Sequence, residues 1–468
     1  MARQSDTVSM NCIDMTWLAL DSINERIVFH AILAIEGEVD AARLNDALLT
    51  TVRRHPALRT VLRRKFLRHY REYRDNIDPQ ILEVCDMAEA RPPQGPGEAA
   101  GDSEHKRYLT EWVNRPLDPK KELPFRVLLL KRGPGQYWLA FTFHHYATDA
   151  LRALRFANEM IREYNKGDEP EAVSDEAVLE DSIKAHRTDE LLPLIQRPKS
   201  KVKWYYPKIA SSLFHRFVIS LFSPTSRIFH DRSGKGGEVS FIRTWLNSIE
   251  LGEIDARSRV LGATVNDVLL AACFKTIEKW NQMHGKSSGK ISIMVPVDVG
   301  RKMSQHIVSN QISYVSPATM PGERADHVDL LKKVSHRTGC VIRNGNAFSM
   351  IYFTYFISRL GFAMMRLVGT LFIATRVYID TTLLTNVGRI RLGDGKEPKL
   401  GNARITDIFG VTPVISPWGM SVVTAVFDGK LQLGLTYRPA YFSDDTAGRF
   451  LDLYVEEIRN YMLALEAA

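Results

Sequence analysis

The sequence has few cysteines, and their spacing suggests no pairing. The 468 residues include four cysteines, which lie far apart and form no C-x-x-C pair: Cys12, Cys85, Cys273 and Cys340. We therefore expect neither a zinc site nor a disulfide framework. Few unpaired cysteines are typical of a reducing compartment. The expected location is the cytoplasm, with the inner surface of the membrane as an alternative.

Long uninterrupted apolar runs are also missing. The first residues contain no apolar segment of the kind that a secretory signal needs, so export by that route is not expected. The most apolar stretch, 350–376, is interrupted by Arg359 and Arg366. Each would cost about 2.5–3.5 kcal/mol at the centre of a spanning helix. We expect this helix either to be buried in protein or to face lipid or an acyl chain.

The charge is unbalanced but not concentrated in one block. The net charge is +8 and the pI is about 9.1, which favours anionic partners such as phosphate-bearing substrates or an acidic membrane surface. No nucleic-acid motif is present, so no nucleic-acid partner is expected. Basic residues alternate with Trp and Tyr in 203–229, which indicates either a linker helix packed on the protein or a peripheral membrane contact.

The length exceeds that of one ordinary core, and strand and helix patterns alternate in both halves. We expect an α/β protein with an N-terminal lobe at 1–195, a crossover linker at 196–238 and a C-terminal lobe at 239–468. The chain is expected to be a monomer. Asp40 and Thr264 are predicted helix caps, and Asp428 with Gly429 is the predicted turn of a late hairpin.

The densest chemistry follows an aromatic strand that begins at Gln136. This strand leads into His144 and His145, and Asp149 comes four residues later, just before a helical pattern. Adjacent side chains on a strand point to opposite faces, so one histidine is expected to act as a base and the other as a support. There are two alternatives: both histidines are hydrogen-bonded core residues, or both are ligands of a metal site. No nearby Cys or His completes a metal site, so we expect no metal.

The spacing His-His-x-x-x-Asp resembles the His-His-x-x-x-Asp-Gly signature of a superfamily of acyltransferases. This superfamily includes chloramphenicol acetyltransferase, peptide-synthetase condensation domains, wax ester synthase/diacylglycerol acyltransferases and polyketide-associated acyltransferases. The resemblance implies that His145 is the catalytic base, that Asp149 is structural and that His144 supports the loop. The final Gly of the signature is Ala150 here, which a turn with positive φ would not accept cheaply.

Further segments resemble the same superfamily and occur in its order. Residues 54–60, Arg-His-Pro-Ala-Leu-Arg-Thr, resemble its arginine segment and imply that Arg59 pairs with Asp149. Residues 292–301 resemble its Val-Pro-Val-Asp strand, and 309–313 take the place of its Gly-Asn segment. The later matches imply three side chains that contact the oxyanion or the substrate: Asn266, Thr385 and Asn386.

The resemblance implies two chloramphenicol-acetyltransferase-like lobes with an active-site channel between them. It also implies acyl transfer from an acyl-CoA or an acyl carrier protein to a hydroxyl acceptor, which we expect to be a lipid or long-chain alcohol. No cofactor is expected to be permanently bound, because the acyl-CoA or phosphopantetheine-linked donor is a substrate. Two alternatives remain, namely a condensation-type amide- or ester-forming protein that acts on carrier-bound substrates, and a catalytically silent homologue that binds a lipid or a carrier.

Overall fold

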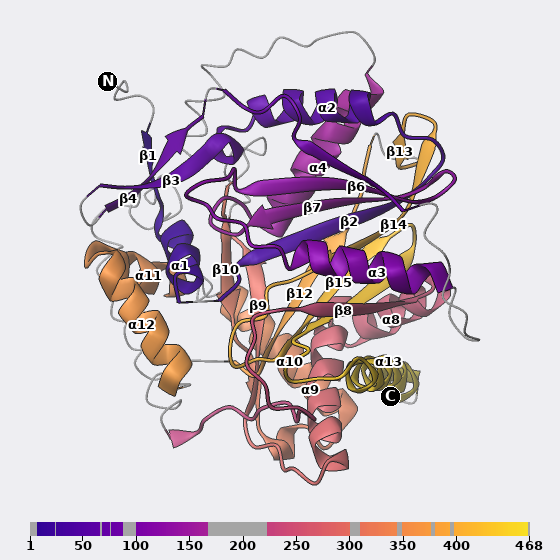
Figure 1. Ribbon diagram of the computed structural model, residues 1–468. Coiled ribbons are helices and arrows are strands. Elements are labelled where there is room, and N and C mark those ends of the chain that lie inside the picture. Colours follow the sequence, from indigo (N-terminus) through magenta and orange to yellow (C-terminus); the bar gives the residue numbers. More distant parts are fainter. Residues whose placement is uncertain are drawn as a thin grey trace.

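The computed structural model contains two α/β lobes, each built on one large sheet (Figure 1). It describes residues 7–23, 25–65, 68–74, 76–87, 100–166, 222–299, 309–343, 349–375, 380–393 and 397–466. The predicted crossover linker therefore lies outside the described residues as far as residue 221, and so does most of the basic and aromatic segment 203–229.

The N-terminal sheet has the strand order β13-β14-β2-β7-β6-β5. Its strands are β2 (Val28–Glu36), β5 (Leu82–Asp86), β6 (Phe125–Gly133), β7 (Gln136–His144), β13 (Lys399–Leu400) and β14 (Ala403–Val411). Helices α2 (Ala41–Arg53) and α4 (Ala150–Asn165) share one apolar cluster with this sheet, and α3 (Ala100–Val113) packs in another cluster on its other face. A small separate sheet joins β1 (Thr7–Ser9), β4 (Arg68–Tyr73) and β3 (Thr60–Lys65).

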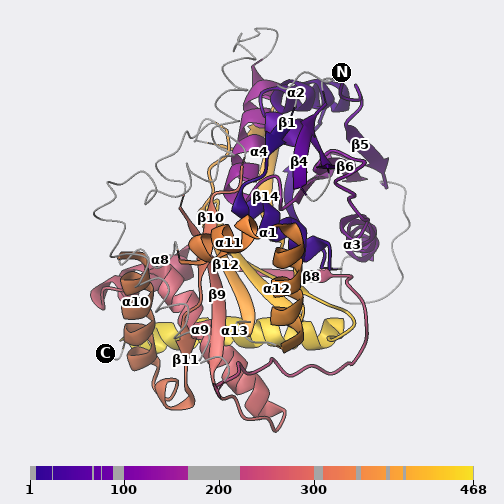
Figure 2. The same cartoon turned by 90° about the vertical axis from the view of Figure 1, so that its left-hand side faces the viewer.

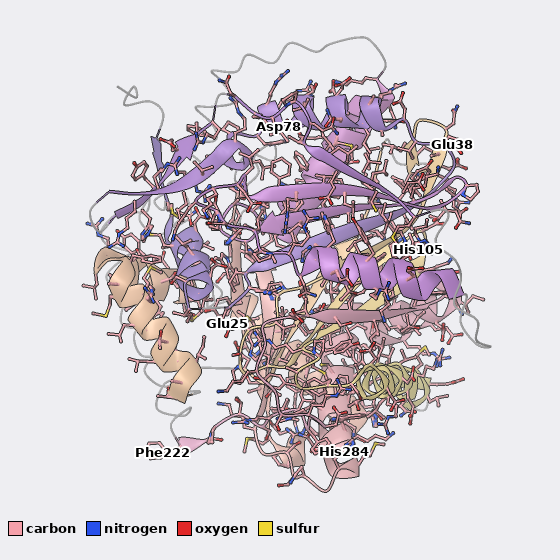
Figure 3. All side chains as sticks on the ribbon, in the orientation of Figure 1. Glu25, Glu38, Asp78, His105, Phe222 and His284 are labelled. Carbon is pink, nitrogen blue, oxygen red and sulfur yellow. The ribbon has the colours of Figure 1, made fainter. Side chains whose placement is uncertain are left out.

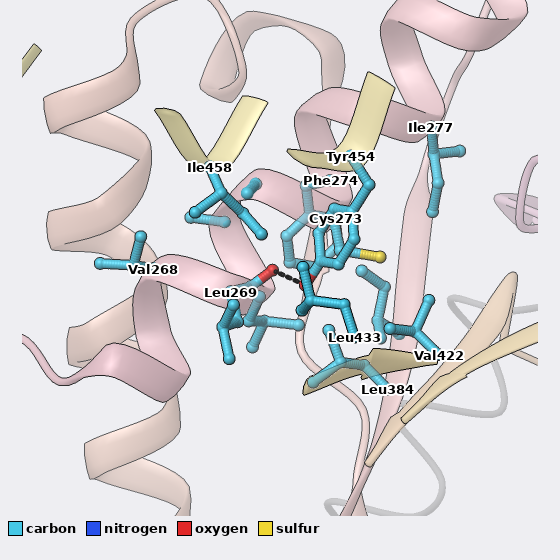
Figure 4. Close-up of a cluster of buried hydrophobic side chains, with 14 of the residues drawn as sticks. Val268, Leu269, Cys273, Phe274, Ile277, Leu384, Val422, Leu433, Tyr454 and Ile458 are labelled. Atoms are coloured by element: carbon cyan, nitrogen blue, oxygen red, sulfur yellow. Dashed lines mark hydrogen bonds between the residues drawn. The ribbon is translucent and has the colours of Figure 1, made fainter. Parts of the chain in front are cut away.

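The C-terminal sheet has the order β10-β9-β12-β15-β16-β8, with β11 paired to β9. Its strands are β8 (Ser240–Leu246), β9 (Ile291–Asp298), β10 (Ile312–Val315), β11 (Ala318–Thr319), β12 (Thr382–Arg389), β15 (Met420–Phe427) and β16 (Lys430–Tyr437). The helices of this lobe are α8 (Ser248–Val260), α9 (Val265–Met283), α10 (His327–Arg343) and α13 (Asp444–Glu466). Figure 4 shows their core, where the Tyr454 hydroxyl donates to the Leu269 carbonyl at 2.9 Å.

Local sequence signals predict several of these boundaries. The Asp40 side chain accepts from the N–H groups of Ala42 and Arg43 at the start of α2. Thr264 caps α9 through the N–H of Asp267. The turn between β15 and β16 has positive φ at Asp428 and Gly429. These three predictions are confirmed, because each depends on chemistry within a few residues of the chain.

The C-terminal half of the chain also contributes strands to the N-terminal sheet. β14 pairs antiparallel with β2 from Arg404 opposite Glu36 to Val411 opposite His30, and β13 pairs with β14. The sequence-based division at residue 239 therefore fails for residues 399–411. No local pattern marks this exchange, because an amphipathic strand has the same alternation whichever sheet receives it.

A buried ion pair joins the lobes beside this exchange. Arg438 contacts the Glu25 carboxylate at 2.6 Å, and both side chains are less than a tenth exposed. Glu25 also accepts from the backbone N–H of Ser416 at 2.9 Å. Figure 3 shows Glu25 near the middle of the molecule, between the two lobes. Because breaking such a pair leaves a buried charge, it holds the lobes in one arrangement.

Residues 349–375 form two helices rather than the single helix expected from the apolar pattern. Helix α11 (Ser349–Arg359) ends before Gly361, which has a φ of 97°, and α12 (Phe362–Thr375) follows. Both pack beside α1 (Cys12–Asp21) on one side of the molecule, which Figure 2 shows face on. No single helix among the described residues is long and apolar enough to cross a membrane, and only the bent pair α8 and α9 passes that test together.

Candidate functional site

His145 lies just beyond the end of β7, in the turn before α4. Its backbone N–H donates to the carbonyl of Ile27 at 2.9 Å, while His144 remains the last residue of the strand. The pairing of β7 with β2 thus continues to His145, and the two rings contact different residues of α1.

The His145 ring is enclosed by aromatic side chains. The Trp17 ring stacks on it with centroids 4.1 Å apart, and Phe29 approaches at 5.1 Å. Only 8% of His145 is exposed. Burial lowers the pKa of His145 to about 4, although the hydrogen bonds that it makes to its own backbone, to Asn310 and to Thr148 oppose that shift. The imidazole is therefore neutral near pH 7, as a general base requires.

Asn310 determines which nitrogen of His145 is free. Asn310 Nδ2 donates to the Asp14 carboxylate at 3.1 Å and to the His145 carbonyl, so its Oδ1 faces His145 Nδ1 at 3.3 Å. An amide oxygen only accepts, so Nδ1 must carry the proton. The lone pair is then on Nε2. Asn310 precedes β10 in the C-terminal lobe, so the His145 imidazole of one lobe is oriented by a side chain of the other.

Asp14, which accepts a hydrogen bond from Asn310, belongs to a buried ion pair. Arg71 on β4 contacts the Asp14 carboxylate at 2.6 Å, and neither side chain is exposed. Arg71 Nη2 also donates to the carbonyl of Tyr146, immediately after His145. The chain of contacts therefore runs from Arg71 through Asp14 and Asn310 to the imidazole. Asp14 and Arg71 stabilise one another because an isolated buried charge would be costly.

His144 is fully buried and has a different role. Its Nδ1 accepts from the N–H of Tyr146 at 3.3 Å, so its Nε2 carries the proton. That Nε2 lies 3.5 Å from the Asp21 carboxylate, in an orientation too poorly aligned for a hydrogen bond. These contacts fix the turn around His145. They fit the support predicted for His144.

Asp149 connects the turn to the second lobe without touching His145. As the N-cap of α4 it accepts from the N–H of Arg152 at 3.1 Å, and it also accepts from the N–H of Gln311 at 2.9 Å. The Arg152 guanidinium contacts Asp149 at 3.2 Å and Asp298 on β9 at 2.9 Å. Burial raises the pKa of Asp149, against the opposing effect of Arg152 and the two N–H donors. Asp149 is thus a structural residue in the described contacts.

The expected pair between Arg59 and Asp149 is not formed. Arg59 ends the short 3₁₀ helix Pro56–Arg59, where it donates to the carbonyls of Arg74 and Arg53 at 3.4 Å. The charged partner of Asp149 is Arg152, which is one helical turn further on and was not singled out in the sequence. A capping carboxylate and the residue three positions later meet by helix geometry alone, which explains the exchange.

The replacement of the signature glycine by Ala150 does not disturb the turn. Ala150 is the first residue of α4, and among the described residues the only non-glycine with positive φ is Asp428. The backbone at this position is helical, a conformation that alanine favours. The signature glycine is therefore not needed here for its conformational freedom.

None of the described hydrogen bonds joins His145 to the predicted contacts Asn266, Thr385 and Asn386. Asn266 lies in the first turn of α9, and Thr385 and Asn386 lie on β12. The Asn386 Oδ1 accepts from the N–H of Gly388 at 2.9 Å. Their role as oxyanion or substrate contacts stays a prediction.

Sequence reasoning missed Asp14, Trp17, Arg71 and Asn310. Only Asn310 had a signal, because it lies in the segment 309–313 that takes the place of a superfamily motif. The other three lie in an apolar helix and a basic strand whose local patterns indicate no chemistry. Their function comes from contacts over long sequence separations.

An apolar cavity lies between α1, the α11 and α12 helices and the β9–β10 edge of the C-terminal sheet. It encloses about 800 Å³, including the part that is open to solvent. Its lining comes from α1, α11, α12, β9, β10 and the loop before β15, and includes Leu20, Phe353, Gly369, Ile373 and Trp418. Trp17 packs in the same apolar cluster as Leu20, Ile373 and Trp418. Trp17 therefore lies between the cavity wall and His145.

The described residues contain no group of three or more His, Cys, Asp or Glu side chains that could hold a metal ion. Asp380 at the cavity accepts from the hydroxyls of Ser292 and Ser316 at 2.6 and 2.9 Å. The candidate site consists of the neutral buried His145 imidazole, the Asn310, Asp14 and Arg71 side chains that support it, and the adjoining apolar cavity.

Comparisons with known proteins agree with this arrangement. The condensation domain family model matches residues 19–188. An uncharacterized protein of Mycobacterium tuberculosis (strains CDC 1551 and H37Rv) is 24% identical over 434 residues, which cover 90% of this chain and 92% of that protein.

Two solved structures resemble the whole chain. The first condensation domain of the CDA synthetase matches with a TM-score of 0.68 at 13% identity, covering 97% of this chain and 96% of that one. The starter condensation domain of rhizomide synthetase RzmA, a variant in complex with C8-CoA and Leu-SNAC, matches with a TM-score of 0.68 at 14% identity, covering 99% and 95%. The fold expectation is confirmed: the chain has the two-lobed fold of condensation domains, and its residues 19–188 are similar to the condensation domain family.

Proposed function

We propose that the protein transfers an acyl group from a CoA or carrier-protein thioester to the hydroxyl of an apolar lipid or long-chain alcohol, with His145 as general base. The observation that carries the proposal is the oriented, neutral His145 imidazole. Asn310 holds its proton on Nδ1, and burial keeps the imidazole neutral near pH 7. An alcohol needs such a base because it is a poor nucleophile at that pH.

The reaction needs no covalent enzyme intermediate. His145 Nε2 takes the proton of the acceptor hydroxyl as its oxygen forms a bond to the thioester carbonyl carbon. The tetrahedral intermediate then collapses, the carbon–sulfur bond breaks and the proton on Nε2 passes to the leaving thiolate. The developing oxyanion needs donors. The indole N–H of Trp17, which has no hydrogen-bond partner in the described structure, is a candidate donor beside the predicted Thr385 and Asn386.

The apolar cavity supports an apolar substrate. A long acyl or alkyl chain gains about 0.8 kcal/mol for each methylene group that it buries. The cavity wall adjoins Trp17, which stacks on His145, so a chain in the cavity would place its polar end towards the base. The similar RzmA domain was crystallised with C8-CoA, which supports an acyl-CoA as the donor here.

The second candidate is a condensation-type amide-forming reaction between carrier-bound substrates. The match of residues 19–188 to the condensation domain family favours it. The two candidates use the same base and differ in the donor and the nucleophile. A protein that uses free acyl-CoA with an alcohol supports the first, and one that requires a loaded carrier domain and an amine supports the second.

The first experiment measures thiol release from acyl-CoAs of increasing chain length, with and without long-chain alcohols, diacylglycerol or short amines. Release should depend on the acceptor and fall about 10²–10⁴-fold in His145→Ala. His105→Ala is the matched control, because it removes a buried histidine from α3 that lies outside the site. Undiminished release in His145→Ala would contradict the assignment of the base.

The pH profile tests the environment of His145. Burial favours the neutral imidazole, so protonation abolishes the base only near pH 4. The acid limb of kcat/KM should therefore have its midpoint near pH 4 instead of about 6.5, the value of an unperturbed histidine. Circular dichroism over the same range separates unfolding from titration. A midpoint between 6 and 7, about the ordinary histidine value, would show that the ring is solvated.

Asn310 is a positioning residue, and its removal should affect turnover more than binding. Asn310→Ala frees Nδ1 from its acceptor and allows the wrong tautomer, so kcat should fall roughly 10–100-fold with little change in KM. Asn45→Ala is a matched control, because Asn45 is also buried and accepts from the N–H groups of Ile81 and Leu82. Equal losses of kcat in both variants would indicate a general effect of destabilisation.

Gly369 tests whether the cavity holds the apolar chain. A Cβ added to Gly369 would lie 3.7 Å from side-chain atoms of Leu20 and Ile23, so a larger residue must occupy the cavity. Gly369→Leu should lower kcat/KM for long chains by roughly fourfold for each methylene that it displaces, and leave short chains unaffected. Thr370→Leu adds the same side chain on the exposed side. Equal losses for all chain lengths would place the substrate elsewhere.

A further inference from the structure

The α11–α12 hairpin has two apolar faces, and only one of them is covered. The inner face supplies Met350, Phe353, Met365, Val368 and Phe372 to the cavity. The outer face exposes large apolar side chains: Phe356 (50%), Leu360 (67%), Met364 (37%), Leu367 (51%) and Leu371 (49%). Figure 3 shows side chains of α12 that project away from the rest of the molecule.

The exposed side chains form a patch rather than isolated exceptions. Met364, Leu367 and Leu371 follow a spacing of three and four residues along α12, which places them on one side of the helix. Phe356 and Leu360 lie one turn apart at the end of α11, where the chain turns into α12. A contiguous apolar surface of this kind marks an interaction site in a soluble protein.

The charge on this surface is entirely positive. Residues 349–375 contain no Asp or Glu. Arg359 and Arg366 are exposed, and neither has an ion-pair partner among the residues that the structure describes. The β3–β4 ribbon adjoins the hairpin through the ring contact of His69 with Phe362 at 4.2 Å, and it carries the exposed Arg64 together with the ion pair of Arg63 and Glu72.

We propose that the outer face of the α11–α12 hairpin docks on an anionic lipid bilayer, so that the apolar cavity behind it lies next to the lipid phase. Apolar side chains beside cations, with no carboxylate, are the composition of a helix that lies in the membrane interface. A second copy of this chain fits less well, because a symmetric contact would bring the arginines of both copies together. Docking does not depend on the acyl-transfer proposal, since it concerns a surface outside the catalytic residues.

The test is co-sedimentation of the full chain with vesicles of phosphatidylcholine alone or mixed with phosphatidylglycerol. Wild type should bind the anionic vesicles and bind less as salt is added. The double variant Leu367→Glu/Leu371→Glu should lose at least about tenfold in binding, because charged side chains are expelled from lipid. Neither leucine lines the cavity, and circular dichroism with thermal unfolding, compared with wild type, is the check that the variant folds.

The matched control is Ile249→Glu/Val260→Glu on α8, which makes the same charge change at exposed apolar residues (72% and 85%) of the C-terminal lobe. This control should bind vesicles like wild type. His145→Ala should also bind normally, which separates docking from catalysis.

The proposal would be overturned if the wild type did not bind vesicles, or if the α8 control lost as much binding as the hairpin variant. It would also be overturned if the hairpin mediated self-association, or bound an acidic carrier protein, while the chain bound no vesicles.

Discussion

The arrangement around His145 depends on one hydrogen bond that crosses the lobes. His145 belongs to the N-terminal lobe, but the Asn310 side chain that fixes its tautomer comes from the C-terminal lobe. Any displacement of the lobes therefore acts directly on the His145 imidazole. This explains why further contacts secure the same junction, namely Arg152 with Asp298, Gln311 with Asp149 and Arg438 with Glu25. Separating the lobes would leave these buried charges without their hydrogen-bond partners, which is costly. The contacts therefore keep the two lobes in one relative arrangement.

The same contacts explain how the buried His145 imidazole stays neutral and oriented. In an apolar enclosure of Trp17 and Phe29, the charged imidazole is disfavoured, so the free base persists at neutral pH. A carboxylate directly on Nδ1 would reverse this effect. Asp14 instead acts through Asn310, whose neutral amide orients the ring without placing a negative charge on it. Arg71 in turn balances the charge of Asp14.

The sequence predicts the fold class, the strand that leads to His145 and the helix that follows Asp149, because these depend on short patterns and on a specific motif. It does not predict that Arg152 replaces Arg59 as the partner of Asp149, because both arginines occur in plausible places and only packing decides between them. Asp14, Trp17 and Arg71 have no local signature at all. The apolar segment 350–376 was recognised, but its break at Gly361 and its two faces follow from its position over α1.

The pairing of β14 with β2 also affects how the chain can be divided. In the intact protein β2 is an interior strand, with β7 on one side and β14 on the other. A fragment that ends before residue 399 would leave one side of β2 with unpaired N–H and carbonyl groups. Such an edge readily adds a strand from another molecule. A polypeptide still emerging from the ribosome passes through this state, so the first lobe stays exposed to aggregation until nearly the whole chain has been made.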